Sequence, residues 1–63
     1  MVKTACFIGR DGSMGLRHGR YYEITIYGKP DEDLIFVEWI GYDGFLWKCP
    51  YGSVEAFMQN WLF

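Results

Sequence analysis

The chain has 63 residues, of which 51% are hydrophobic and 21% aromatic, and its formal net charge is −2. A chain this short cannot divide its apolar residues between two cores, so we expect residues 1–63 to fold as one domain. The high aromatic content argues against intrinsic disorder. No apolar run approaches the roughly 20 residues of a membrane-spanning helix. Residues 1–4 lack the apolar segment of a signal peptide, and a cytoplasmic location is therefore expected.

The charge is unevenly distributed along the chain. Residues 1–20 carry four basic side chains and one acidic one, whereas residues 21–63 carry two basic and seven acidic ones. The whole chain is too acidic to bind polyanions in general, but its basic N-terminal third can contact phosphate groups locally.

Two strands are predicted in the first half of the chain. Residues 3–8 form the first, and Gly9 ends it. Residues 9–19 include four glycines, which is typical of a long, folded-back loop. Met14 and Leu16 are apolar, so we expect this loop to pack against the core. Residues 20–27 alternate, with Ile24 and Ile26 on one side and polar or tyrosine side chains on the other, which predicts the second strand.

A polar, proline-containing connection over residues 28–33 leads to a predicted hairpin of residues 34–42 and 45–49. Asp43-Gly44 favours a two-residue type I′ turn. That turn places Tyr42 opposite Phe45 and Ile40 opposite Trp47. One predicted face then carries Phe36, Ile40, Tyr42, Phe45 and Trp47, and the other carries Ile35, Val37, Trp39 and Leu46. Because both faces are apolar, we expect both to be covered.

A short helix over about residues 54–61 closes the predicted fold. Pro50 ends the preceding strand, Ser53 is a favourable N-cap, and Glu55 lies in the first turn. Apolar residues follow at helical spacing up to Trp61. These elements predict a mainly β protein, a small SH3-like, partly open barrel of four or five antiparallel strands with a short C-terminal α-helix. The alternative is an OB-fold, which usually needs a longer chain.

The segment over residues 7–24, FIGRDGSMGLRHGRYYEI, resembles the first half of SH3-like barrels. In those barrels a strand also runs into a long loop, and an apolar-basic-x-Gly segment opens the second strand. Together with CPYGS at 49–53 and Phe57…Asn60-Trp61, the pattern resembles short uncharacterised SH3-like-barrel proteins of Gram-positive bacteria and their phages. The resemblance implies a small accessory protein that binds or inhibits a host factor. It does not imply polyproline binding, since the terminal Pro-x-x-Tyr turn of signalling SH3 domains has no clear match.

Nothing in the sequence predicts an enzyme, and we expect no catalytic residue, metal or other cofactor. His18, the single histidine, lies beside Arg17 in the glycine-rich loop without a recognisable acid–base partner. The run of acidic residues at 31–33 is typical of a solvated turn. Two cysteines and one histidine are too few for a structural zinc site. Cys6 and Cys49 are expected to be small buried hydrophobic residues, with a disulfide as the alternative if their strands are neighbours.

Three tryptophans, five tyrosines and five phenylalanines are more aromatic surface than one small core readily buries. An exposed aromatic patch is typical of a partner or self-association surface, so we predict a protein-interaction module, with homodimerisation as one form of it. The alternative is internal packing of the rings, which we expect for Trp39 and leave open for Trp47. The predicted partner-binding residues are Arg10, Arg17, His18, Arg20, Tyr42, Phe45 and Trp47.

Two other binding functions stay open. Single-stranded nucleic acid could stack its bases on Tyr21 or Tyr22 while the basic loop contacts phosphates, although the acidic isoelectric point of about 5.1 opposes this. The same glycine-rich loop could instead hold a small anion on its backbone amides and arginines.

Overall fold

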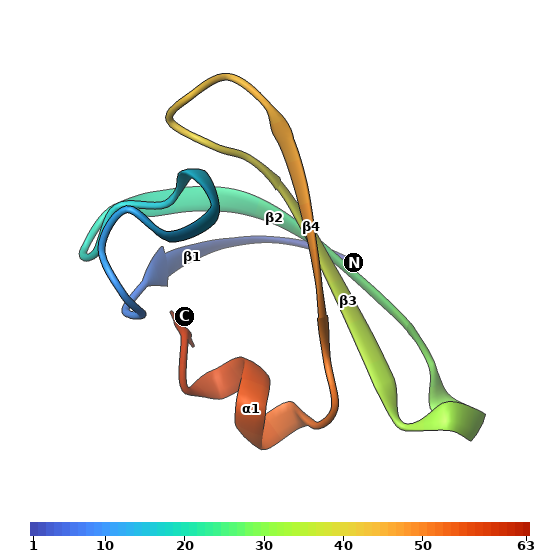
Figure 1. The fold of residues 1–63 in the computed structure, drawn as a ribbon. Coiled ribbons are helices and arrows are strands. Elements are labelled where there is room, and N and C mark those ends of the chain that lie inside the picture. The colour runs from blue at the N-terminus through green and yellow to red at the C-terminus, as the bar shows by residue number, and fades with distance from the viewer.

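The computed structural model describes residues 1–63, with the exception of the Pro30 side chain. It contains five strands and one short α-helix (Figure 1). Their bounds are β1 Val2–Phe7, β2 Tyr21–Lys29, β3 Leu34–Ile40, β4 Leu46–Tyr51, α1 Val54–Met58 and β5 Trp61–Leu62. Two 3-10 turns, η1 over Ser13–Gly15 and η2 over Pro30–Glu32, lie in the β1–β2 and β2–β3 connections. No helix of the described chain is long and apolar enough to cross a membrane.

The strands form one antiparallel sheet in the order β4-β3-β2-β1-β5. The first four strands follow one another as a meander, and β5 returns to the free side of β1, where Phe7 pairs with Trp61. The sheet curls around its inner face, with α1 beside its open end (Figure 1). Within the described backbone β4 and β5 are not paired, so the sheet stays open. This arrangement confirms the predicted mainly β fold, a small partly open barrel with a short helix near its C-terminus.

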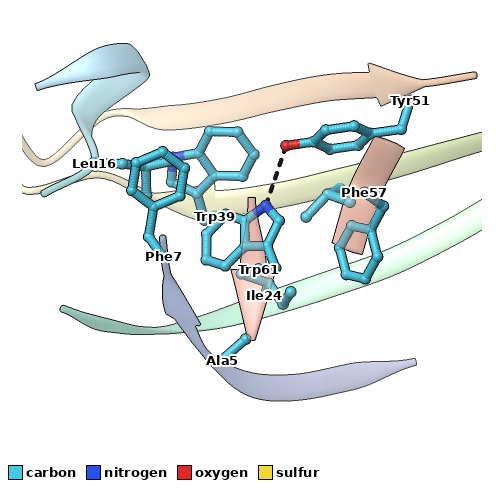
Figure 2. Packing of buried hydrophobic residues seen from close by; sticks show 9 residues of the cluster. Ala5, Phe7, Leu16, Ile24, Trp39, Tyr51, Phe57 and Trp61 are labelled. Carbon is cyan, nitrogen blue, oxygen red and sulfur yellow. Dashed lines mark hydrogen bonds between the residues drawn. The ribbon is translucent and has the colours of Figure 1, made fainter. Parts of the chain in front are cut away.

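Trp61 is the centre of the core. Its side chain is fully buried, and its ring lies 5.2 Å from that of Phe7 and 5.6 Å from that of Trp39 (Figure 2). Its indole N–H donates a 3.1 Å hydrogen bond to the Tyr51 hydroxyl. Leu16, from the glycine-rich loop, is also buried, which confirms that the loop packs against the core. The core cluster consists of Ala5, Phe7, Leu16, Ile24, Val37, Trp39, Tyr51, Phe57 and Trp61.

The predicted register of the β3–β4 hairpin is wrong by one residue. Ile40 lies opposite Leu46, and Trp39 lies opposite Trp47. Residues 41–45 connect the two strands, and among them only Gly44, with φ of 83°, takes the left-handed conformation. A type I′ turn would require this conformation of Asp43 as well. Since side chains alternate between the faces of a strand, this shift moves Trp47 to the inner face and Leu46 to the outer one.

The predicted helix over 54–61 is also too long. The Ser53 side chain accepts a hydrogen bond from the Ala56 N–H, as expected for the N-cap, but α1 ends at Met58. Trp61 lies in β5 instead, because pairing with Phe7 and burial of its indole in the core outweigh one further helical turn. Pro50 does not end its strand, because β4 is an edge strand and can accommodate a residue without an N–H.

Both cysteine thiols are free. Cys6 is buried on β1 and Cys49 is half-buried on β4, and β2 and β3 lie between their strands. The disulfide alternative is therefore wrong, and both residues pack as small hydrophobic side chains.

Candidate interaction surfaces

The end of the β3–β4 hairpin carries a group of exposed apolar side chains, which we call the hairpin surface: Ile40, Tyr42, Phe45 and Leu46. Ile40 and Leu46 are directly opposite each other across the strands, and they are 58% and 66% exposed. Tyr42 and Phe45, on the connection between them, are also more than half exposed. Neighbouring apolar side chains left open in this way are typical of a surface that contacts another molecule. Two of the predicted binding residues, Tyr42 and Phe45, belong to it.

The fold brings the glycine-rich loop against the hairpin. The Tyr42 N–H donates a 2.8 Å hydrogen bond to the Gly15 carbonyl oxygen. The Arg17 guanidinium lies 4.6 Å from the centre of the Tyr42 ring, within the range of a cation–π interaction. Arg17 and Arg20 also line a hollow of about 270 Å³ together with Tyr21, Tyr22 and Tyr42. Arg17 and Arg20 of the glycine-rich loop thus lie beside Tyr42 of the hairpin surface, although they are far apart in sequence.

Arg10 and His18 lie outside this hollow, although they belong to the same loop. The His18 N–H donates to the Asp11 carboxylate, and its ring Nδ1 lies 2.9 Å from the Gly9 carbonyl oxygen. Asp11 also forms an ion pair with Arg17, at 3.8 Å. Asp11 therefore connects two parts of the glycine-rich loop and neutralises part of the positive charge of that loop.

Trp47 packs on the inner face of the sheet, on the opposite side from Ile40 and Leu46 of the hairpin surface. Its side chain is half-buried on the inner face, and the indole N–H donates to the Asp43 carboxylate at 3.1 Å. A Cβ at Gly15 would lie only 2.5 Å from the Trp47 Nε1, which shows how closely the loop packs on the ring. Trp47 thus fixes the hairpin relative to the glycine-rich loop. Trp39 is buried, as expected, and donates to the Met14 carbonyl oxygen.

The sequence did not indicate a polar–aromatic cluster on the outer face of the sheet. The rings of Tyr27 and Phe36 stack with their centres 5.5 Å apart, and the Lys48 Nζ lies 4.8 Å from the centre of the Phe36 ring. The Tyr27 hydroxyl donates to the Glu38 carboxylate. Interaction with Tyr27, assisted by the negative charge of Glu38, raises the pKa of the Lys48 amine. The corrected register, with Glu38 opposite Lys48, is the signal that could have revealed this cluster.

No family model matches the chain, and no curated protein or solved structure matches it. The resemblance to proteins of Gram-positive bacteria and their phages therefore stays a prediction.

Proposed function

We propose that this protein is a non-enzymatic, cytoplasmic protein-interaction module that contacts its partner through the hairpin surface. The observation that carries the proposal is the exposed cross-strand pair of Ile40 and Leu46. Two apolar side chains at the centre of a contact, with Arg17 and Arg20 at its edge, follow the usual arrangement of an apolar interface core and a polar rim. In line with the resemblance, the partner we propose is a host factor that a phage-encoded accessory protein binds or inhibits.

The residues of the edge strand β4 indicate that the partner binds through side-chain contacts and does not add a strand to the sheet. β4 ends the sheet on one side, and an unprotected edge would pair with other strands without selectivity. Lys48 and Pro50 lie on this strand, and charged residues and proline are what proteins place on edges to prevent such pairing. The partner therefore contacts the end of the hairpin and not the open edge.

The test is affinity capture from a lysate of the native cells, with the double variant Ile40→Ser/Leu46→Ser compared with wild type. If each side chain loses about 1.5 kcal/mol of burial in the complex, affinity falls roughly 100-fold and the captured partner is lost. The matched control is Val2→Ser/Leu62→Ser, since these side chains are exposed to a similar degree, 58% and 55%, on β1 and β5. Both variants must melt like wild type.

Capture of the same partner by wild type and by Ile40→Ser/Leu46→Ser would contradict the proposal. Light scattering after size exclusion distinguishes a homodimer from a complex with a different partner protein. A dimer that dissociates only in Ile40→Ser/Leu46→Ser would identify the partner as a second copy bound through the hairpin surface.

A second candidate function, binding of single-stranded nucleic acid, is favoured by the hollow beside Arg17 and Arg20. Tyr21 is 72% exposed at this hollow, so a base can stack on it while the two guanidinium groups contact phosphates. The test is fluorescence anisotropy with a labelled oligothymidine at low and moderate salt. This candidate predicts salt-sensitive binding that Arg17→Ala/Arg20→Ala abolishes and that the control Lys3→Ala/Lys29→Ala retains. Absence of binding at micromolar protein would exclude it.

A further inference from the structure

Figure 1 shows the opposite end of the β3–β4 hairpin, where β3 begins and β4 leads into α1. A second apolar surface lies at this end. It is a groove of about 650 Å³ between the inner face of the sheet and the start of the helix. Ile26 on β2 and Ile35 on β3 are half-buried in it, and Met1 and Val54 line its mouth. No residue of the hairpin surface contributes to this groove.

The groove is open because two features leave the inner face uncovered here. Gly28 lies opposite Ile35, and a Cβ at this position would collide with the Leu34 carbonyl oxygen. The strands are therefore too close for a side chain at Gly28, and none fills the space. In addition, α1 has only five residues and leaves Val54, at its beginning, 62% exposed.

Carboxylates outnumber cations among the residues that line the groove and their neighbours in sequence. Asp33 lines it, and Asp31 and Glu32 precede Asp33 in the exposed η2 turn. Glu55 follows Val54 in the first turn of α1. The nearby cations are Lys29, which precedes η2 in sequence, and the Met1 ammonium group, which lies at the mouth of the groove and donates to the Ile26 carbonyl oxygen. Among the residues whose side chains the structure describes, these four carboxylates form no ion pair.

We infer that this groove is a docking site for a basic amphipathic segment of a partner protein. The apolar side chains of the segment enter between Ile26, Ile35 and Val54, and its lysines or arginines face the carboxylates of η2. The excess of carboxylates around the groove selects against lipids and other ligands with anionic head groups, because like charges repel. The inference goes beyond the proposed function, since it concerns other residues at the other end of the sheet and another contact chemistry.

The test is fluorescence anisotropy with a short labelled peptide in which a Leu-Leu pair is flanked by lysines. Two control peptides carry glutamates in place of the lysines or serines in place of the leucines. The inference predicts that only the Leu–Lys peptide binds. Val54→Ser should lower the affinity for this peptide roughly tenfold, which corresponds to about 1.4 kcal/mol of lost apolar burial.

Neutralising η2 with Asp31→Asn/Glu32→Gln/Asp33→Asn should weaken binding several-fold and remove most of its salt dependence. Asparagine tolerates the left-handed conformation of Asp33, which has φ of 51°, so the turn is retained. Ile40→Ser/Leu46→Ser should leave peptide binding unchanged, which separates this test from that of the proposed function. Equal binding of the glutamate peptide, displacement by oleate, or indifference to Val54→Ser would each overturn the inference.

Discussion

Replacement of Tyr51 with phenylalanine tests the polar contact at the centre of the core. The Tyr51 hydroxyl accepts a 3.1 Å hydrogen bond from the Trp61 indole N–H (Figure 2). It accepts a second one, of 3.3 Å, from the Asn60 side-chain amide. Trp61 is fully buried, so its N–H has no access to water once the hydroxyl is removed. The phenylalanine ring keeps the edge-on contact with Phe57, whose ring centre lies 5.6 Å away. The substitution therefore removes the acceptor without creating a large cavity.

A buried donor without a partner costs about 1–3 kcal/mol. For a domain of this size, a loss of about 2 kcal/mol lowers the melting temperature by roughly 10 °C. Thermal unfolding followed by circular dichroism measures this shift. The control is Tyr27→Phe, which removes an exposed hydroxyl bonded to Glu38 and should change stability by less than about 0.5 kcal/mol. Equal stability of Tyr51→Phe and Tyr27→Phe would refute the reasoning.

Two further predictions concern alkaline pH and the glycine-rich loop. Burial raises the pKa of Tyr51 against the opposing effect of its hydrogen bonds with Asn60 and Trp61. The folded state thus holds this proton more tightly than the unfolded state does, and the stabilisation is complete below about pH 10 and is lost as the pH rises further. Urea unfolding at increasing pH should show this decline in wild type and a weaker one in Tyr51→Phe; parallel curves would contradict it. In the loop, Gly12→Ala and Gly15→Ala both place alanine at positive φ, 81° and 71°, at a cost of about 1–2 kcal/mol. Only the second introduces a Cβ against the Trp47 ring, so it should cost roughly 1–3 kcal/mol more, and equal unfolding free energies would refute the proposed packing.

The parts of the fold that depend on local pattern could be predicted from the sequence. The alternation in β2 correctly places Ile24 on the buried face, and the Ser53 cap marks the start of α1. The fold class follows from such elements, because a meander of short strands with an apolar inner face has few ways to close.

The parts that depend on contacts between distant segments could not be predicted. The turn preference of Asp43-Gly44 favours a two-residue connection, but the Tyr42 N–H is held by Gly15, far away in sequence. With this contact the connection spans residues 41–45, and the shifted register exchanges the two faces of β4. Similarly, helical spacing included Trp61, whereas its burial against Phe7 places it in β5.

The same limitation applies to the candidate site. Composition indicated a surplus of exposed apolar surface, and the hairpin pattern assigned it to Tyr42, Phe45 and Trp47. Tyr42 and Phe45 are exposed, whereas Trp47 is half-buried. Ile40 and Leu46, which were not among the predicted binding residues, are exposed beside them. The groove next to Gly28 depends on how closely β2 and β3 approach, which no local pattern shows.

The central claim is that the end of the hairpin is open for contact with another protein. Site-specific photo-crosslinking in the native cells, with a photoreactive phenylalanine at position 45, tests it most directly. The account predicts one discrete crosslinked product, which disappears when Ile40 and Leu46 are both serine. Crosslinking from the control position Glu23, on the outer face of β2, together with no product from position 45, would contradict it.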